Sequence, residues 1–436
     1  MRISVFGMGY VGAVCSACFA KDGHQIIGVD PQQVKVDLIN QGKSPIIEEG
    51  LEELIAASVS SGNLKAVQNV QVAIEKSDIS IICVGTPSRI NGSLNLDYIK
   101  LVCEEIGAAI KNKQGRHTIV MRSTVLPGTA QELAIPALEQ SSGKKMGEGF
   151  GYVSNPEFLR ESTAIFDFYH PPKTVIGETD TESGEIIASL YSNLEAPLIR
   201  TDVAIAEMVK YADNAWHAVK VSFGNEIGNI AKKLDIDGQK VMDIFCQDQK
   251  LNLSSYYLRP GFAFGGSCLP KDVRAITYKA RDLDIHTPLL SSLIPSNNEQ
   301  IDRAFSLLKQ TQKKKIAMLG ISFKANTDDL RESPLVELVE KMIGKGYDIK
   351  IYDKCVSIAK LVGANKEYIM QHIPHVSDLL DDNLEHVINH ADVIIIGNNA
   401  EEFQNIRSVI KDGTHIIDLV RIKNLEDKPL YQGICW

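Results

Sequence analysis

The sequence contains no long hydrophobic run. No apolar stretch among its 436 residues approaches the roughly 18 residues that a membrane-spanning helix needs. A basic segment followed by an apolar one, as in a secretory signal, is also missing, because Met1 and Arg2 lead directly into a short apolar run. We therefore expect a cytoplasmic protein that does not enter a membrane.

Positive charge is scarce. The chain has 46 Lys and Arg residues against 55 Asp and Glu residues, which gives a formal net charge of -9. Nucleic-acid binding depends largely on clustered Lys and Arg side chains that meet the phosphate backbone. The composition therefore argues against a nucleic-acid partner and favours a small-molecule role.

Cysteine is too sparse for a disulfide framework. The eight cysteines of this long chain should be thiols in a reducing compartment. Cys15 and Cys18 have C-x-x-C spacing but lie in an apolar helical run, so we expect them to pack in a core. No second C-x-x-C pair and no histidine with metal-ligand spacing accompanies them, and we therefore predict no metal site.

The first 200 residues do have a repeating β-α pattern. Short β-rich apolar runs alternate with helical patterns, which is typical of a parallel sheet connected by helices. The predicted strands are 3–6, 25–29, 79–84, 118–121, 152–154 and 174–176.

The strand signals fade after residue 203 and return after Lys313. Residues 204–234 carry apolar side chains at helical spacing without a proline, which predicts one long helix. Ser333 and Pro334 precede another helical pattern and fit an N-cap and a first helical position. The predicted strands of the last part are 316–319, 348–352, 393–396 and 415–420.

Together these patterns predict an α/β protein. We expect two Rossmann-like, doubly wound α/β domains joined by a helical middle domain with a long central helix. The predicted boundaries are 1–202, 203–300 and 301–436.

A glycine-rich loop follows the first predicted strand. Gly7, Gly9 and Gly12 have the spacing G-x-G-x-x-G, a helical stretch follows them, and the second strand ends at Asp30. In this setting the first glycine permits a tight turn, the second admits a pyrophosphate, and the third lets helix and strand pack closely. The carboxylate of Asp30 can accept both ribose hydroxyls of NAD, whereas it would repel the 2′-phosphate of NADP. We predict NAD as the cofactor.

A second loop presents a thiol. Cys268 follows a Gly-Gly pair and precedes Lys271 and Asp272, so a cation that favours the thiolate and a carboxylate lie close in sequence. The glycines also allow backbone N–H groups to approach a developing oxyanion. Cys268 is a candidate nucleophile, and a buried loop cysteine is the alternative.

Four polar residues recur along the predicted long helix. Lys210, Asn214, His217 and Asn225 fall on one stripe of a largely apolar helix. Such a stripe faces either water or a polar pocket, and the pattern alone does not decide between the two. In a pocket, Lys210 could hold an oxyanion.

Further polar residues stand where predicted parallel strands end, at the edge where open α/β sheets bind ligands. Together with the features above, they resemble the UDP-glucose/GDP-mannose dehydrogenase family nearly end to end. The resemblance is carried by the glycine fingerprint, Thr86-Pro87, Arg122 to Gly128, Asn155 to Glu161, Lys210 with Asn214, and Gly265 to Asp272.

Within the family, the chain resembles the members that oxidise GDP-mannose. This likeness lies in the segment Asn252 to Arg259 and in the long loop Gly261-Phe-Ala-Phe-Gly-Gly, which is usually shorter in enzymes of UDP-glucose. The resemblance implies a four-electron oxidation of the sugar C6 alcohol, through a thiohemiacetal and a thioester on Cys268, to a nucleotide-linked uronic acid such as the precursor of an alginate-type polysaccharide. UDP-glucose as substrate of the same mechanism is the alternative.

The resemblance also implies roles for individual residues. Lys210 and Asn214 would stabilise oxygen charge, and Asp272, Glu161 and Thr124 would position or activate water. Which carboxylate is the base stays open. Cofactor contacts would come from Gly7, Gly9, Tyr10, Val11, Gly12, Asp30, Lys35, Thr86, Thr124, Lys271 and Arg331. Substrate contacts would come from Glu161, Lys210, Asn214, His217, Asn225, Tyr256, Tyr257, Arg259 and Lys324.

The last α/β domain departs from the dinucleotide pattern. After its first strand come Gly320 and Lys324 without the second and third fingerprint glycines, so we expect no second NAD there. By resemblance this domain binds the nucleotide sugar, and Arg331 reaches the cofactor; a local ion pair with Asp328, Asp329 or Glu332 is the alternative for Arg331. The family also implies a homodimer through the middle domain, able to assemble to a tetramer, with Tyr256, Tyr257 and Arg259 near a neighbouring subunit.

Two alternative functions would account for part of the sequence. A hydroxyacid-type dehydrogenase would share the NAD domain and the helical domain but make a single oxidation, and would need neither Cys268 nor a third domain. A non-catalytic NAD-binding sensor would have no use for a thiol beside an acid, so Lys210, Cys268, Lys271 and Asp272 together argue against it.

Overall fold

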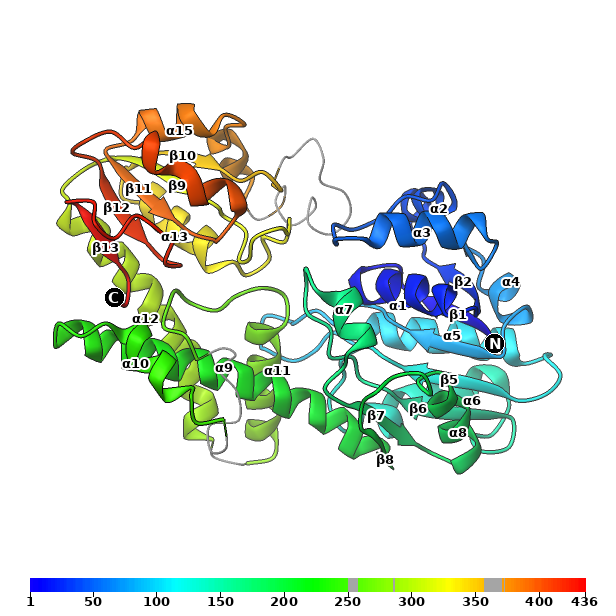
Figure 1. Cartoon of the computed structure of the whole chain (residues 1–436). Coiled ribbons are helices and arrows are strands. Elements are labelled where there is room, and N and C mark those ends of the chain that lie inside the picture. The colour runs from blue at the N-terminus through cyan, green and yellow to red at the C-terminus, as the bar shows by residue number, and fades with distance from the viewer. Residues whose placement is uncertain (250–257, 285–286, 357–370, 372) are drawn as a thin grey trace. The chain divides into compact units, whose positions relative to one another are not determined.

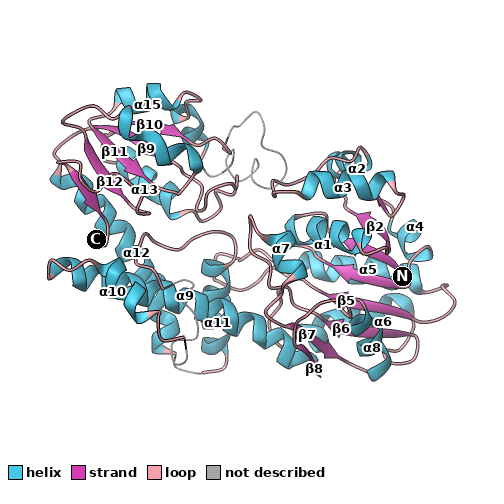
Figure 2. Cartoon of the chain, in the orientation of Figure 1, coloured by secondary structure: helices cyan, strands magenta, loops and turns pink. Residues whose placement is uncertain are grey.

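The computed structural model describes residues 1–436 except 250–257, 285–286, 357–370 and 372. The chain divides into two compact units, Met1–Asp213 and Asn214–Trp436. Each unit contains one sheet flanked by helices (Figures 1 and 2). The predicted α/β class is confirmed.

The sheet of the first unit has eight strands in the order β3-β2-β1-β4-β5-β6-β7-β8. Neighbouring strands are parallel, except for the antiparallel pair β6 and β7. The strands are β1 (Arg2–Phe6), β2 (Gln25–Val29), β3 (Leu64–Val67), β4 (Ile79–Ile82), β5 (His117–Met121), β6 (Phe150–Ser154), β7 (Thr174–Glu178) and β8 (Leu198–Asp202).

Helices cover both faces of this sheet. Alternate strand residues point to opposite faces, and here they enter two separate cores. Val5 and Ile81 pack with α1 and α3, whereas Phe6 and Ile82 pack with α5 and α6. The sheet is therefore doubly wound. Its helices are α1 (Tyr10–Lys21), α2 (Gln33–Asn40), α3 (Leu51–Ser60), α4 (Val70–Glu75), α5 (Asp97–Ile110), the π-helix η1 (Ala130–Ala134), α6 (Ile135–Ser142), α7 (Ala164–Tyr169) and α8 (Thr181–Ser189).

Helix α9 (Val203–Lys233) is the long helix expected from the sequence, and the border between the two units falls within it. The helices that follow are α10 (Gly238–Phe245), α11 (Leu269–Asp282) and α12 (Pro288–Gln310). Cys268 lies at the N-cap of α11, and Pro270 stands in the first turn, where its missing N–H costs nothing.

A second sheet, entirely parallel, follows these helices in the order β10-β9-β11-β12-β13. Met318 and Ile395 enter one core, and Leu319 and Ile396 enter another, so helical segments again pack on both faces. The elements are β9 (Lys315–Leu319), α13 (Pro334–Ile343), β10 (Asp348–Tyr352), the 3₁₀ helix η2 (Pro374–Leu379), α15 (Leu384–His390), β11 (Val393–Ile396), the 3₁₀ helix η3 (Glu401–Ser408), β12 (His415–Asp418) and β13 (Tyr431–Gly433).

The structure differs from the sequence predictions at three points. The first sheet is mixed, because the chain enters β7 antiparallel to β6 after the loop that contains Glu157 and Glu161. Strands β3, β8 and β13 were not predicted. Ser333 precedes α13 as expected, but its hydroxyl donates to the Ile321 carbonyl instead of capping the helix.

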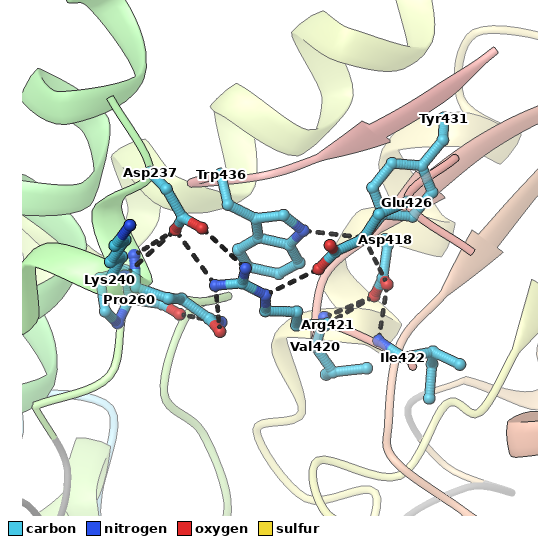
Figure 3. A network of polar contacts seen from close by, with 11 residues as sticks. Asp237, Lys240, Pro260, Asp418, Val420, Arg421, Ile422, Glu426, Tyr431 and Trp436 are labelled. Carbon is cyan, nitrogen blue, oxygen red and sulfur yellow. Dashed lines mark hydrogen bonds and ion pairs between the residues drawn. The ribbon is translucent and has the colours of Figure 1, made fainter. Parts of the chain in front are cut away.

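The C-terminal residues attach to the helices of the second unit through Arg421. Its guanidinium lies between the carboxylates of Asp237 and Glu426, with the Trp436 ring beside it (Figure 3). Asp237 also accepts from two backbone N–H groups at the start of α10. The same carboxylate therefore caps a helix and holds the segment between β12 and β13.

Candidate active site

The glycine loop joins β1 to α1. A Cβ atom on Gly12 would lie 1.9 Å from the Gly7 carbonyl oxygen, so only glycine fits there. Gly7 has a φ of +90°, which other residues rarely adopt. A Cβ on Gly9 would meet nothing within 4 Å, so no protein atom requires glycine at that position. The loop thus fits a dinucleotide: Gly7 and Gly12 shape it, and Gly9 leaves the helix N-terminus open to a pyrophosphate.

Asp30 follows β2 and is 3% exposed. Its carboxylate accepts from the backbone N–H groups of Met8, at 2.8 Å, and Gln32, at 2.9 Å, and Lys35 Nζ lies 3.2 Å away. Each carboxylate oxygen can accept more than one hydrogen bond. Asp30 therefore fixes the glycine loop and keeps capacity for ribose hydroxyls. Tyr10 and Val11, the other predicted cofactor residues here, form the first turn of α1.

The predicted residues at the ends of β4 and β5 come together. The Thr86 hydroxyl donates to the Thr124 carbonyl at 2.9 Å, and the neighbouring Ser123 hydroxyl donates to the Val84 carbonyl at 2.7 Å. These loops end adjacent parallel strands, which explains why their hydroxyls share one edge of the sheet.

The loop after β6 is held by a buried arginine. Arg122 donates to the Asn155 side-chain oxygen at 2.6 Å, to the Tyr191 hydroxyl at 2.9 Å and to the Cys15 sulfur at 3.1 Å. Cys15 and Cys18 are both fully buried in α1, as the sequence predicted. The motif residues Arg122 and Asn155 thus stabilise the conformation of the loop that carries Glu157 and Glu161.

Glu157 forms a buried ion pair with Lys210 of α9, with 2.9 Å between Oε1 and Nζ. Burial alone would raise the pKa of Glu157, but the Lys210 ammonium and the Leu159 N–H outweigh it, and the pKa is lowered. The pair places a carboxylate beside the predicted oxyanion holder. In the sequence, Glu157 stands out only as part of a loop at the end of a strand, and no local pattern links it to Lys210.

Glu161 is half-buried and lies just before a left-handed residue, Ser162, with a φ of +69°. The turn is tied down by Glu48, a buried carboxylate that accepts from the N–H groups of Ser162, at 2.8 Å, and Ala164, at 2.7 Å. Glu48 also accepts from the Tyr10 hydroxyl. The glycine loop and the turn at Glu161 are therefore connected through one carboxylate.

Helix α9 has its polar stripe on the inside. Lys210, Asn214 and Asn225 are at most 6% exposed, and His217 is half-buried. The stripe therefore does not face water, so the interpretation as a solvated helix face is removed. The opposite stripe of α9, about half a turn away, carries exposed apolar residues: Ile205, Met208, Trp216 and Phe223.

The thiol loop brings three predicted residues together in the second unit. Cys268 is exposed at the N-terminus of α11, where the helix dipole favours an anionic sulfur. Asp272, one turn on, is 1% exposed and accepts from the Asn214 side-chain amide. Lys271 Nζ lies 3.2 Å from Asp272 Oδ1, and that oxygen accepts no hydrogen bond from any residue that the structure describes. A buried carboxylate with an open acceptor beside a thiol can orient a water molecule.

The second α/β sheet carries a carboxylate at the same place as Asp30. Asp353 follows β10 and accepts from the N–H groups of Ile321 and Ser322 and from the Ser322 hydroxyl, at 2.9 to 3.0 Å. Lys324 lies half-buried in this loop. Unlike Asp30, Asp353 accepts a hydroxyl, which belongs to Ser322 in the loop after β9.

The remaining predicted residues are spread more widely. Arg331 donates twice to the Asp329 carboxylate, at 2.6 and 2.9 Å, so the local ion pair that the sequence offered as an alternative is present. Arg259 is exposed, 3.9 Å from Asp243. Tyr256 and Tyr257 lie outside the described residues.

In the part of the chain that the structure describes, no three His, Cys, Asp or Glu side chains are grouped as a metal site would need. Every described helix is too short or too polar to cross a membrane.

Models of one protein family match almost the whole chain. Residues 1–195 match the NAD binding domain of the UDP-glucose/GDP-mannose dehydrogenase family, residues 204–299 its central domain, and residues 317–424 its UDP binding domain. The chain is 57% identical over 438 residues to a GDP-mannose 6-dehydrogenase of Pseudomonas putida, with 100% of both chains covered.

Two solved structures are similar over the full chain. A GDP-mannose dehydrogenase from Pseudomonas aeruginosa, crystallised as a ternary complex, is 55% identical with 100% of both chains covered and a TM-score of 0.58. A UDP-glucose dehydrogenase from Pyrobaculum islandicum is 30% identical, with 100% of this chain and 97% of that chain covered and a TM-score of 0.91.

Proposed function

The chain belongs to the UDP-glucose/GDP-mannose dehydrogenase family, and from this premise we propose that it oxidises GDP-mannose at C6 to GDP-mannuronate with NAD. The observation that supports this substrate is 57% full-length identity to a GDP-mannose 6-dehydrogenase, against 30% to a UDP-glucose dehydrogenase. UDP-glucose 6-dehydrogenase activity by the same chemistry is the second candidate. A uronic acid product would suit synthesis of an alginate-type polysaccharide, in the cytoplasm.

The thiol chemistry explains why Cys268 is needed. NAD, when bound, supplies the hydride acceptor for each of the two oxidations. An aldehyde cannot readily lose a second hydride until a nucleophile adds to it. Cys268 sulfur forms a bond to the aldehyde carbon while the carbonyl π bond opens and its oxygen takes a proton. Oxidation of this thiohemiacetal gives a thioester, and water then cleaves the C–S bond to release the carboxylate and the thiol.

Other residues of the chain hold charge and water during these steps. Lys210 and Asn214 would stabilise the oxygen that becomes anionic. Asp272, with one open acceptor oxygen, and Glu161, with Thr124, would orient water for thioester hydrolysis. The pairing of Glu157 with Lys210 favours an ionised lysine, as an oxyanion holder requires.

The residues around the glycine loop would hold the cofactor. Asp30 would bind the ribose hydroxyls, Tyr10 and Val11 the pyrophosphate through their N–H groups, and Thr86 and Thr124 the nicotinamide side. Lys35, Lys271 and Arg331 would add positive charge around it. For the sugar nucleotide we propose His217, Asn225, Tyr256, Tyr257, Arg259 and Lys324 as further contacts, and 1–202, 203–300 and 301–436 as the cofactor, middle and sugar-nucleotide domains.

We also propose that the protein is a homodimer through its middle domain, able to assemble to a tetramer. The exposed apolar stripe of α9 supports this, because Trp216 and Phe223 remain 45% and 42% exposed in the single chain. Sedimentation should give at least twice the chain mass of 48.0 kDa, and Trp216→Glu should lower it. A wild-type protein that sediments as a single chain would contradict this proposal.

The yield of NADH per sugar tests the activity. The wild type should form two NADH per GDP-mannose and turn over UDP-glucose poorly, whereas Cys268→Ser should lose the full oxidation. Cys355→Ser, at a half-buried cysteine of the last domain, serves as the matched control. One NADH per sugar would reject the thioester route, and turnover of UDP-glucose alone would overturn the substrate.

A further inference from the structure

The loop that leads to Cys268 has no regular secondary structure. Residues 258–267 form neither helix nor strand, and Phe264 within them is buried. Backbone N–H and C=O groups in such a loop still need hydrogen-bond partners, since a buried polar group without one is costly. In this loop, side-chain amides supply many of these partners.

Four side-chain amides from three helices bond to its backbone. Asn225 of α9 accepts from Gly261 N–H at 2.8 Å and donates to the Phe262 carbonyl at 3.1 Å. Asn297 of α12 accepts from Phe264 N–H and donates to the Phe264 carbonyl, both at 2.8 Å. The other two contacts are Gln300 to the Gly261 carbonyl at 2.5 Å and Gln239 to the Pro260 carbonyl at 3.1 Å.

The amides are themselves fixed. Asn297 is 7% exposed and Gln300 2% exposed, and the Gln300 oxygen accepts from Asn229 at 2.9 Å. The Gln239 oxygen accepts from Arg421 at 3.0 Å, so the contacts around Arg421 in Figure 3 continue to the loop at Pro260. Each amide therefore has its donor and acceptor ends assigned by its neighbours.

The loop's Gly-Gly pair is confined from another direction. A Cβ on Gly265 would lie 2.3 Å from the Pro334 ring, and one on Gly266 would lie 2.9 Å from the Phe323 ring. Arg274 of α11 also forms a two-point ion pair with Glu332, at 2.5 and 2.6 Å. The start of the loop is thus held by hydrogen bonds, and the residues next to Cys268 are confined by packing.

We propose that Asn297 and Gln300, with Gln239, are positioning residues for Cys268. They act through the loop backbone and hold the sulfur where it can add to the aldehyde, an inference that rests on the proposed function. Primary amides suit this task because each offers both a donor and an acceptor without a charge. A carboxylate could only accept and an ammonium could only donate, and either charge would alter the electrostatic potential around the thiolate.

This role predicts an unequal effect on the two oxidations. The alcohol step needs no thiol, whereas the aldehyde step begins with C–S bond formation. Displacement of the sulfur by about 1 Å is enough to slow a reaction on the order of 100-fold. Loss of an amide contact should therefore slow the second oxidation and spare the first.

The test compares Asn297→Leu, which keeps size but removes both hydrogen bonds, with Asn298→Leu, an exposed neighbour on the same helix. Single-turnover NADH formation is followed with GDP-mannose, and released aldehyde is trapped with hydroxylamine. In Asn297→Leu, we expect the first NADH within about threefold of wild type, the second slowed by about 10- to 100-fold, and trapped aldehyde. Asn298→Leu should behave as wild type.

Hydrogen exchange of the peptide 258–268 supplies a readout that does not depend on the reaction. It should speed up in Asn297→Leu and remain unchanged in the control, because Phe264 N–H loses its acceptor. Equal loss of both oxidations, or an unchanged second step despite faster exchange, would overturn the positioning role.

Gln300→Met and Asn297→Ser provide the same comparison if Asn297→Leu does not fold. A wild type that makes one NADH per sugar would instead reject the proposed function. In that case, unchanged exchange in the variants would still show that the amides do not hold the loop.

Discussion

Glu207 is a carboxylic acid buried near the start of α9. It is 2% exposed and accepts from the N–H groups of Gly128, at 3.0 Å, and Ala130, at 3.2 Å. Burial raises its pKa to about 7, and the two N–H groups only partly oppose the rise. The side chain therefore changes charge close to neutral pH while it binds the first turn of η1.

This raised pKa predicts a stability that falls with rising pH. The folded protein binds the Glu207 proton more tightly than the unfolded chain does, so the stabilisation is complete below about pH 4.5 and disappears as the pH passes about 7. Since one pKa unit corresponds to about 1.4 kcal/mol, we expect wild type to lose roughly 2 kcal/mol relative to Glu207→Gln between pH 5 and 8. Urea unfolding at several pH values measures the difference.

The exposed Glu148→Gln variant is the control for a change of charge alone. It should follow the wild-type pH dependence. Parallel stability curves for wild type and Glu207→Gln would mean that Glu207 does not titrate in this range.

At the scale of structural elements, the turn from β1 into α1 depends sharply on a single residue. Gly12→Ala would place a methyl group 1.9 Å from the Gly7 carbonyl, so the helix must move away from the strand. We expect NAD affinity to fall by at least tenfold, because the N–H groups that face the pyrophosphate shift with the helix. Titration calorimetry with NAD measures the effect.

Gly344→Ala provides the comparison at a glycine that needs no special fit. A Cβ there would lie 3.5 Å from the Glu340 carbonyl oxygen, which is an ordinary contact. It should bind NAD as wild type does. Unchanged affinity in Gly12→Ala would contradict the assignment of this loop to the cofactor.

The elements that the sequence predicted correctly are those marked by a pattern of nearby residues. The glycine spacing and Asp30 predicted the first βαβ unit, and the unbroken helical pattern predicted α9 to within a residue at each end. The direction of β7 had no such signal, because a strand reads alike in either direction. Its pairing depends on how the buried loop after β6 turns back.

The candidate site was partly predictable for the same reason. The stripe of α9 could be read from its spacing, but the same spacing describes a solvated face, and only the packing distinguishes the two. Glu157 and Lys210 are far apart in sequence, and Asn297 and Gln300 bond to backbone, which leaves no pattern of residue types. Contacts of these kinds become visible only in the folded chain.

At the scale of the whole chain, Arg421 links segments far apart in sequence. It donates to Asp237 at 2.7 and 3.1 Å and to Glu426 at 2.9 Å, and Lys232 of α9 reaches the carbonyls of Gly433 and Trp436. The end of the chain is thereby tied to the helices that precede the thiol loop.

We expect Arg421→Met to destabilise the protein by about 1 to 2 kcal/mol, because charge-assisted hydrogen bonds are lost and Asp237 loses its partner. The melting temperature measures this. Arg407→Met, which removes an exposed two-point pair with Asp427, is the control and should leave the melting temperature nearly unchanged. Equal decreases in melting temperature for the two variants would show that the contacts of Arg421 stabilise the protein no more than an exposed ion pair does.

The two carboxylates that follow the second strand of each sheet bear on protein engineering. Asp353 occupies the place of Asp30 but already accepts two N–H groups and a hydroxyl of the loop after β9. All three groups donate to the same oxygen, Oδ2, so after a graft of the missing glycines behind β9 a ribose would compete with Ser322 for that atom. A redesign would therefore begin with Ser322. A search for cofactor sites that relies on an acid at this position alone would wrongly include the second sheet as a dinucleotide site.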